Sequence, residues 1–256
     1  MKREKKCVDD RRNQILKIMQ SNPQVKVNEL ANELDVSFIT IRRDLQFLND
    51  QKLLVRTHGG AIPLDNHTME ENEVQMYRRL IAQYAATLVE KGDTLFINTS
   101  SNALQMLQYV TRNNVTVITN NGKVINHEYG TGINVILTGG ELRYHKDAMV
   151  GDYAIRNLKT VYAKKAFVGC SGLTAESGMM TEIASEVSVN EIMVNHSTKA
   201  VYLLADHTKI GKMSSFTSCT IDKIKYLITD EKAPEEVLEK LRSKGVLVYQ
   251  VHKGEF

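Results

Sequence analysis

Two adjacent arginines stand in the stretch VSFITIRRDLQFL, residues 36–48. At about 100° per residue, an α-helix here would gather on one face the residues Ile39, Thr40, Arg42, Arg43, Gln46 and Phe47. Arginine and glutamine can make paired hydrogen bonds to guanine and adenine edges, and apolar groups can lie against a thymine methyl. This face suits the major groove of DNA. Taken alone, the arginine pair could equally be solvated or held by Asp44 or another acid.

A second polar group follows a short apolar run, at Asn98, Thr99, Ser100, Ser101 and Asn102. This loop opens the helical stretch ALQMLQYV, and hydroxyls and free N–H groups at a helix start suit a phosphate or another anion. A capping run without a ligand is the alternative. Asp206 and Lys209 follow another apolar run. Lys209 would supply the cation that a phosphate needs, unless it is simply a surface lysine.

Amide and glycine residues follow the other short apolar runs. They lie in TNN at 119–121, TGGELR at 138–143 and GCSG at 169–172, and the ligand candidates among them are Asn120, Gly139, Gly140, Glu141, Gly169 and Gly172. Ligands of an open α/β sheet bind outside the carboxyl ends of its strands, so these loops are expected to meet around one small acidic ligand. Arg143 either clamps an anion or pairs with Glu141, and the tight GGE turn favours the structural role.

Three helices are predicted near the N-terminus. Apolar residues at helical spacing run from Asp9 or Asp10 to the SNP stop at 21–23, and a second stripe lies in VNELANEL at 27–34. Ser37 is an N-cap candidate for a third helix that ends near Leu48. Its core-facing residues should be Phe38, Ile41, Leu45 and Leu48. The second and third helices, joined by a tight turn, form a helix-turn-helix.

A basic hairpin is predicted directly after the third helix. Residues 53–57 favour a strand, Gly59-Gly60 a turn, and Ala61-Ile62 the start of a return strand. Such a hairpin is typical of the wing of a winged helix-turn-helix.

The larger remainder alternates strands and helices. After the helical stretch 76–92, strands are predicted at 93–98, 115–120, 133–140, 164–170, 199–206, 223–230 and 245–251. This alternation indicates an α/β fold with a parallel, Rossmann-like sheet. Residues 62–75 are polar and acidic and lack helical periodicity, so a linker is expected there.

Composition narrows the class of protein. Residues 1–60 contain 12 Lys+Arg and 8 Asp+Glu, whereas residues 61–256 contain 21 and 22, so the basic excess lies at one end. This asymmetry suits a nucleic-acid contact by a small first domain. No apolar run approaches a membrane span or a signal peptide. The three cysteines and seven histidines show no disulfide or metal spacing.

Residues 9–61 resemble the N-terminal winged helix-turn-helix of the DeoR family of bacterial transcription regulators. The similarity lies in the Val-Ser pair, the TIRRDL run and the HGGA ending, in the family's order and spacing. It implies that Ser37, Ile39, Thr40, Arg42, Arg43 and Gln46 of the third helix face operator bases, and that Arg56 and His58 of the wing contact backbone or minor groove. Asp44 is expected to support an arginine or the wing, because phosphate repels a carboxylate.

The second half resembles the effector domain of the same family, which is similar to sugar-phosphate isomerases. The shared segments include GDTLFINTSSN, TGGELR, KKAFVGCSGL and DHTKIGK. They imply a phosphorylated sugar or related metabolite, bound by the first loop, the glycine-rich loops, Asp206 and Lys209. The first loop departs from the family, which usually has an aspartate at position 98 and a glycine two residues later. The effector is therefore expected to be atypical or weakly bound.

Two alternatives remain open. A sugar-phosphate isomerase needs a positioned base, and the candidates Glu141, Glu182, Glu186, Asp206 and Asp230 form no compact acid–base pair in sequence. Cys170 has no neighbouring histidine and is expected to be a buried thiol. A DNA-binding protein with a vestigial pocket is the other alternative.

We predict a cytoplasmic, non-enzymatic transcriptional regulator, a repressor of a carbohydrate-utilisation operon. Residues 1–61 form the winged helix-turn-helix DNA-binding domain, 62–75 the linker and 76–256 the effector-sensing α/β domain. The expected partners are double-stranded operator DNA, a small effector such as a sugar phosphate, and further copies of the chain in a homodimer or homotetramer, because paired half-sites match a symmetric protein. No cofactor, metal or membrane partner is expected.

Overall fold

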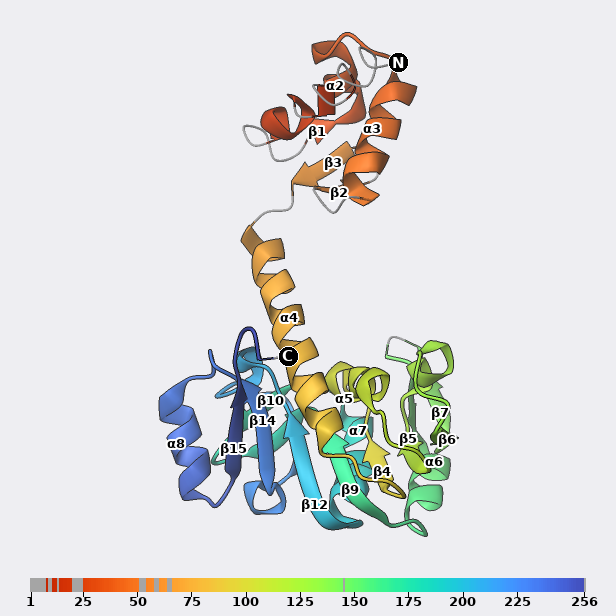
Figure 1. Cartoon of the computed structure of the whole chain (residues 1–256), viewed down its shortest axis with the longest axis vertical. Coiled ribbons are helices and arrows are strands. Elements are labelled where there is room, and N and C mark those ends of the chain that lie inside the picture. The colour runs from red at the N-terminus through yellow and green to blue at the C-terminus, as the bar shows by residue number, and fades with distance from the viewer. Residues whose placement is uncertain are drawn as a thin grey trace. The chain divides into compact units, whose positions relative to one another are not determined.

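The chain divides into two compact units, Met1–Glu73 and Val74–Phe256 (Figure 1). The computed structural model describes residues 8, 11–12, 14–19, 25–50, 54–57, 60–63, 66–144 and 146–255. For residues 50, 55–57, 62–63 and 66–72 it describes the backbone alone. Each unit has a hydrophobic core of its own.

The N-terminal unit contains the predicted helices. Residues 14–19 are helical, α2 spans Val27–Glu33 and α3 spans Phe38–Asp50. The Ser37 hydroxyl accepts a hydrogen bond from the Thr40 backbone N–H at 3.2 Å, which is the predicted cap of α3. On the buried side of α3 lie Ile41, Leu45 and Leu48.

The prediction for Phe38 is wrong, because half of its surface is exposed. It is the first residue of α3 and lies about 60° from the centre of the buried stripe. No preceding turn of the helix covers it.

A three-stranded sheet completes the N-terminal unit, in the order β1-β3-β2. β2 (Leu54–Thr57) and β3 (Gly60–Pro63) form the predicted antiparallel hairpin, with Thr57 opposite Gly60. Of the turn predicted at Gly59-Gly60, Gly59 lies outside the described residues and Gly60 belongs to the return strand. β1 (Val25–Lys26) was not predicted, and it pairs with β3 so closely that a Cβ on Gly60 would lie 2.2 Å from the Val25 carbonyl oxygen.

The C-terminal unit is built on a parallel sheet of seven strands (Figure 1). Each of the seven predicted runs overlaps one of its strands, which are β4 (Thr94–Ile97), β5 (Val115–Thr119), β6 (Ile133–Leu137), β9 (Ala163–Val168), β12 (Ser197–Leu204), β14 (Tyr226–Asp230) and β15 (Leu247–Val251). β9 and β12 begin one and two residues before the predicted runs. The order is β15-β14-β12-β9-β4-β5-β6. The chain moves to one side from β4 and to the other from β9, so the topological switch point lies between these two strands.

Helices cover both faces of this sheet (Figure 1). One face packs against α4 (Asn66–Thr87), α5 (Ser101–Met106) and the 3₁₀ helix η1 (Leu107–Tyr109). The other packs against α6 (Gly151–Leu158), α7 (Ala184–Asn195) and α8 (Glu235–Ser243). Side chains along β4 alternate between the faces: Leu95 and Ile97 join the first core and Phe96 the second.

Short elements surround the sheet. They are the 3₁₀ turns η2 (Gly122–Asn126), η3 (His207–Lys209) and η4 (Ile221–Lys223), the hairpin of β7 (Glu141–Arg143) and β8 (Ala148–Val150), and a small antiparallel sheet of β10 (Gly172–Thr174), β11 (Gly178–Thr181) and β13 (Phe216–Cys219). None of these strands was predicted, because runs of three or four residues are too short to show a periodicity.

Residues 66–75, expected to be part of an irregular linker, form the first part of α4. The stretch lacks glycine and proline and contains three glutamates, one methionine and one glutamine, which favour helices. The helix was predicted only from residue 76, where the periodic apolar residues begin. The preceding residues continue the same helix without such a pattern.

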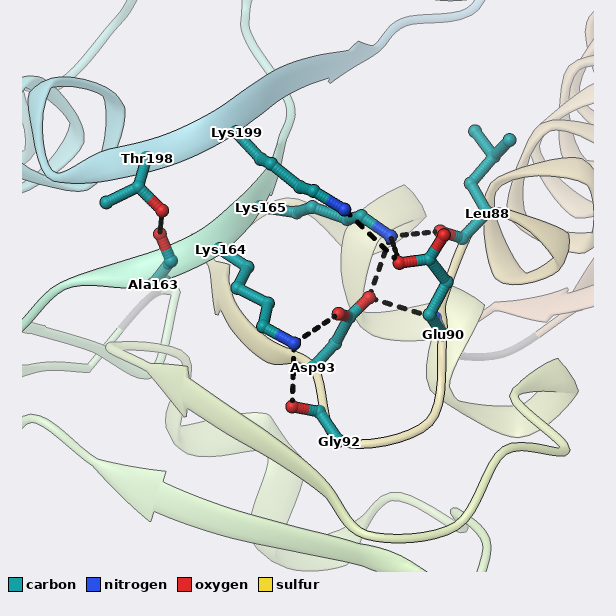
Figure 2. A network of polar contacts seen from close by, with 9 residues as sticks. All are labelled: Leu88, Glu90, Gly92, Asp93, Ala163, Lys164, Lys165, Thr198 and Lys199. Carbon is teal, nitrogen blue, oxygen red and sulfur yellow. Dashed lines mark hydrogen bonds and ion pairs between the residues drawn. The ribbon is translucent and has the colours of Figure 1, made fainter.

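A buried ion-pair network joins the end of α4 to the start of β4 and β9 (Figure 2). Lys165 Nζ donates to Asp93 Oδ2 and to the Leu88 carbonyl oxygen, each at 2.8 Å. Burial would lower the pKa of Lys165, but the hydrogen bonds and charges of Asp93 and Glu90 outweigh it and raise that pKa. This network lies at the amino ends of the strands and holds the last turn of α4 against the sheet.

Replacing Lys165 with methionine should lower the free energy of unfolding of the C-terminal unit by about 3 kcal/mol, because the buried Asp93 carboxylate loses its closest cation. Urea unfolding followed by circular dichroism measures the loss. Lys199→Met is the control, since Lys199 is largely exposed and only approaches Glu90 at 3.6 Å. Equal losses in the two variants would show that the buried pair has no special weight.

Candidate functional site

The exposed face of α3 carries the predicted DNA-reading side chains. Ile39 is 64% exposed, and Arg42, Arg43 and Gln46 are exposed as well. Neither arginine forms an ion pair with any residue that the structure describes. Thr40 is half-buried, and its hydroxyl lies 2.9 Å from that of Ser37. The two guanidinium groups are therefore available to an acceptor outside the protein.

Asp44, the acid next to Arg43, has a structural role. It is 2% exposed and accepts hydrogen bonds from Arg11 Nε at 2.6 Å and Arg12 Nε at 2.9 Å. The Arg12 guanidinium also lies 3.6 Å above the centre of the Phe47 ring. Asp44 thus holds the first helix against α3 and pairs with neither Arg42 nor Arg43, which have no ion-pair partner in the described part of the chain.

Two predicted contacts of the wing cannot be placed. Arg56 belongs to β2, opposite Ala61, but its side chain lies outside the described residues. His58 also lies outside them.

A polar pocket opens at the carboxyl ends of β4 and β9, the switch point of the sheet, with a volume of about 280 Å³. Eight of the predicted ligand residues line it: Asn98, Thr99, Ser100, Ser101, Asn102, Gly169, Asp206 and Lys209. They come from three loops that are far apart in sequence. The parallel register of β4, β9 and β12 brings those loops together.

The other five predicted ligand residues are absent from the pocket lining. Asn120 bonds the Met149 carbonyl oxygen at 3.1 Å through its side chain, and its Oδ1 is buried without a partner. Glu141 is exposed in β7. Gly139 has φ +67°, and Cβ atoms on Gly140 and Gly172 would lie 2.5 and 2.3 Å from backbone oxygens of Val150 and Lys212. Backbone conformation and close backbone contacts explain glycine at positions 139, 140 and 172. Ligand contact at the five positions stays a prediction.

Both the nitrogen and the oxygen of the Asn98 side-chain amide form hydrogen bonds within the protein. Its Nδ2 donates to the Gly169 carbonyl oxygen at 2.9 Å and to Asn190 Oδ1 at 3.0 Å. Its Oδ1 accepts from the backbone N–H groups of Gly169 at 3.0 Å and Ser100 at 3.2 Å. The side chain is 3% exposed. Asn98 therefore joins the ends of β4 and β9, and its role here is to shape the pocket.

The rest of the first loop also bonds to the protein. Ser100 Oγ accepts from the Ala103 backbone N–H at 3.4 Å, which is a helix cap, and Thr99 Oγ1 donates to Glu186 Oε1 at 3.0 Å. The capping interpretation of Ser100 is thus correct. It does not exclude a ligand, because Ser100 and Ser101 also line the pocket.

Four cations line the pocket: Arg78, Lys123, Lys146 and Lys209. Arg78 Nε donates to Asp206 Oδ2 at 2.8 Å, whereas the three lysines form no ion pair with a described residue. Burial would raise the pKa of Asp206, but hydrogen bonds from Thr208 and Arg78 and the charges of Arg78 and Lys209 lower it below its ordinary value. Asp206 is therefore an anion that fixes Arg78, and three lysines remain for an anionic ligand.

Several residues that line the pocket were not predicted from the sequence. Arg78 shares the helical stripe of Ile81, Ala82 and Ala85, all fully buried, so a cation on an apolar stripe was the available signal. Lys123 follows the predicted strand end at 119–121 and could have been found there. For Lys146 and Asn190 no spacing in the sequence points to the pocket.

Glu186 was considered only as a catalytic base. It lines the pocket from the first turn of α7, is 4% exposed, and accepts hydrogen bonds from Thr99 and Thr181 hydroxyls. Cys170 and Glu182 also line the pocket. Burial raises the pKa of Cys170 to about 12, so its thiol stays protonated, and Glu182 is exposed.

The described residues contain no group of three His, Cys, Asp or Glu side chains arranged to hold a metal ion. No helix among them is both long and apolar enough to cross a membrane.

Two family models match the chain. The DeoR-like helix-turn-helix domain matches residues 11–67, and the DeoR C-terminal sensor domain matches residues 73–231. Together they account for both units.

Similar proteins are named as regulators. The HTH-type transcriptional regulator GolR of Listeria innocua is 31% identical over 247 residues, which cover 93% of this chain and 97% of that protein. The lactose phosphotransferase system repressor of Staphylococcus aureus is 29% identical over 240 residues, covering 89% and 94%. Among solved structures, a D-ribose-5-phosphate isomerase in complex with phospho-erythronic acid is 11% identical over 53% of each chain, with a TM-score of 0.39.

Replacing Asn98 with aspartate should lower the free energy of unfolding by about 1–3 kcal/mol, because two donated hydrogen bonds are lost and a carboxylate faces the Gly169 carbonyl oxygen. Thermal unfolding of the full chain measures it. Asn126→Asp, on the exposed surface of η2, is the control and should leave the melting temperature unchanged. An unchanged melting temperature for Asn98→Asp would refute the joining role of this amide.

Proposed function

The chain belongs to the DeoR family of transcriptional regulators, and we propose that it is a repressor whose hold on operator DNA is controlled by a small phosphorylated metabolite. The name of the lactose phosphotransferase system repressor supports the repressor role and a carbohydrate operon as its target. The observation that carries the proposal is the pocket at the switch point, lined by three lysines that lack an ion pair among the described residues.

DNA recognition is assigned to the exposed face of α3. Arg42 and Arg43 are exposed and unpaired by any described acid, because Asp44 is already occupied by Arg11 and Arg12. Guanidinium groups on a helix of this length can make paired hydrogen bonds to guanine in the major groove. Ile39 would add an apolar contact to a thymine methyl, and Ser37 a contact to backbone phosphate at the helix start.

Ligand recognition is assigned to the pocket. A phosphate group is complementary to Lys123, Lys146 and Lys209, and Arg78 can add its terminal nitrogens while its Nε holds Asp206. The hydroxyls of the first loop would contact the rest of the ligand. The volume of about 280 Å³ suits a small metabolite and not a large cofactor.

Arg78 gives the ligand a direct route to α4. This helix begins at Asn66 in the N-terminal unit and ends at Thr87 in the C-terminal unit. A ligand that binds Arg78 favours one position of α4 over another, and such a difference in affinity between two states is what allows a ligand to switch DNA binding. Whether the ligand releases DNA or promotes binding depends on which state it favours.

The remaining features of the proposal follow from this role. The protein acts in the cytoplasm, where operator DNA lies, and as a homodimer or homotetramer, which matches paired half-sites. Catalysis is not part of the role: Cys170 is protonated, and the buried acids Asp206 and Glu186 are engaged with Arg78, Thr99 and Thr181.

Arg43→Ala should weaken binding to the operator by about 1–3 kcal/mol and relax the preference for operator over unrelated DNA, because paired hydrogen bonds to a base edge are lost. Fluorescence anisotropy on the protein's own promoter fragment measures both affinities. Lys17→Ala removes the same charge from an exposed position of the same unit, and it should lower both affinities equally or not at all. An unaltered operator affinity in Arg43→Ala would exclude this arginine from base recognition.

Lys209→Ala should leave operator affinity unchanged and weaken the response to phosphorylated ligands at least about tenfold, because one phosphate contact is removed. The measurement is the same anisotropy assay, titrated with sugar phosphates and their unphosphorylated parents. The control is Lys212→Ala, an exposed lysine three residues away that does not line the pocket. If Lys209→Ala responds like Lys212→Ala, the pocket assignment fails at this residue.

A further inference from the structure

Glu186 is a buried acid in the wall of the pocket. It is 4% exposed, and its two oxygens accept hydrogen bonds from Thr99 Oγ1 at 3.0 Å and Thr181 Oγ1 at 2.8 Å. No lysine, arginine or histidine of the described residues forms an ion pair with it. Two other buried acids of the same unit differ in this respect, since Asp93 pairs with Lys165 and Asp206 with Arg78.

The two hydroxyls and the start of α7 stabilise this carboxylate only in part. Hydroxyl donors are neutral, and the amino end of a helix contributes the equivalent of a partial charge. A carboxylate has about four acceptor positions, of which the threonines fill two. Buried acids without a partner charge are rare, so the open positions of Glu186 favour a donor that comes with the ligand.

The pocket therefore presents uncompensated charge of both signs. Among the described residues, the three lysines and Glu186 form no ion pair, although all four line the same small cavity. None of the described lysine nitrogens comes within ion-pair distance of the Glu186 carboxylate, so these charges do not neutralise one another. A ligand with a phosphate alone would satisfy the lysines and leave Glu186 as it is. A ligand with a phosphate and a protonated amine would satisfy both.

We propose that the ligand of this pocket is a phosphorylated amino sugar or a similar amino polyol phosphate, whose protonated amine donates to Glu186. This inference rests on the proposed function for the phosphate and adds the amine. Thr99 and Thr181 orient the carboxylate by holding one position on each of its oxygens. Glu186 is thus the residue that separates amino sugar phosphates from their hydroxyl counterparts.

The test compares matched ligands that differ only in the amine. Isothermal titration calorimetry of the full chain at pH 7 would use glucosamine 6-phosphate against glucose 6-phosphate, and galactosamine 6-phosphate against galactose 6-phosphate. A charge-assisted hydrogen bond exceeds a neutral one by enough to predict at least about tenfold tighter binding of the amine in one of the pairs. Equal or weaker binding of the amine in both pairs would overturn the proposal.

Glu186→Gln tests the residue while keeping the shape of the side chain. It should reduce the advantage of the amine to less than about threefold, because a neutral amide offers the amine no charge-assisted hydrogen bond. Glu191→Gln removes an exposed acid from the same helix, outside the pocket, and should keep the full advantage. An advantage that persists in Glu186→Gln would overturn the assignment to this carboxylate.

The same titrations distinguish a failure of the amino-sugar inference from a failure of the phosphate pocket. If sugar phosphates bind and the amine adds nothing, the amino-sugar inference fails while the phosphate pocket stands. If none of the four phosphorylated compounds binds, the phosphate pocket of the proposed function fails, and the amino-sugar inference fails with it.

Discussion

The ends of β4 and β9 are joined by the single amide of Asn98, and the pocket depends on this junction. A doubly wound sheet opens a crevice where its connections diverge, yet the two strand ends there still need their backbone groups satisfied. Asn98 binds both the N–H and the carbonyl oxygen of Gly169, and it reaches α7 through Asn190. Gly169 allows this approach, because a Cβ at that position would lie 2.1 Å from the Ser100 hydroxyl oxygen. The loop that follows Asn98 therefore faces the pocket.

Buried acids place cations in both units by the same physical rule. Asp44 holds Arg11 and Arg12 against α3, Asp93 holds Lys165 beneath the sheet, and Asp206 holds Arg78 in the pocket. A buried carboxylate without a partner is costly, so each acid fixes the position of its partner. Among the described residues, Arg42 and Arg43 on α3 and the pocket lysines form no ion pair with an acid, and these are the cations that the proposed function assigns to nucleic acid or ligand. The positions of the buried acids thus indicate which cations are held in place by the protein.

The sequence predicted most of the architecture because its signals are local and repeated. Seven apolar runs marked the seven strands, and the stripe of Ile41, Leu45 and Leu48 marked the buried side of α3. The sequence could not predict β1, whose residues Val25 and Lys26 pair with Ala61 and Gly60, and it predicted an arginine on Asp44 without showing that the partners are Arg11 and Arg12. These features depend on contacts between distant segments. The same limit applies to the pocket, where loops after strands were found and Lys146 and Asn190 were not.

The position of Arg78 decides how far a ligand's effect must travel. In many sensors a ligand contacts loops, and a chain of packed side chains must carry the change to a distant element. Here a residue of α4 is itself part of the pocket wall. Its neighbour Tyr77 donates a hydrogen bond to Glu231 at 2.8 Å, and the Leu88 carbonyl oxygen, just after the end of α4, accepts one from Lys165. The C-terminal part of α4 is therefore bonded to the rest of its unit on both sides of Arg78. Under the proposed function, a ligand that alters the ion pair of Asp206 with Arg78 acts on this helix directly.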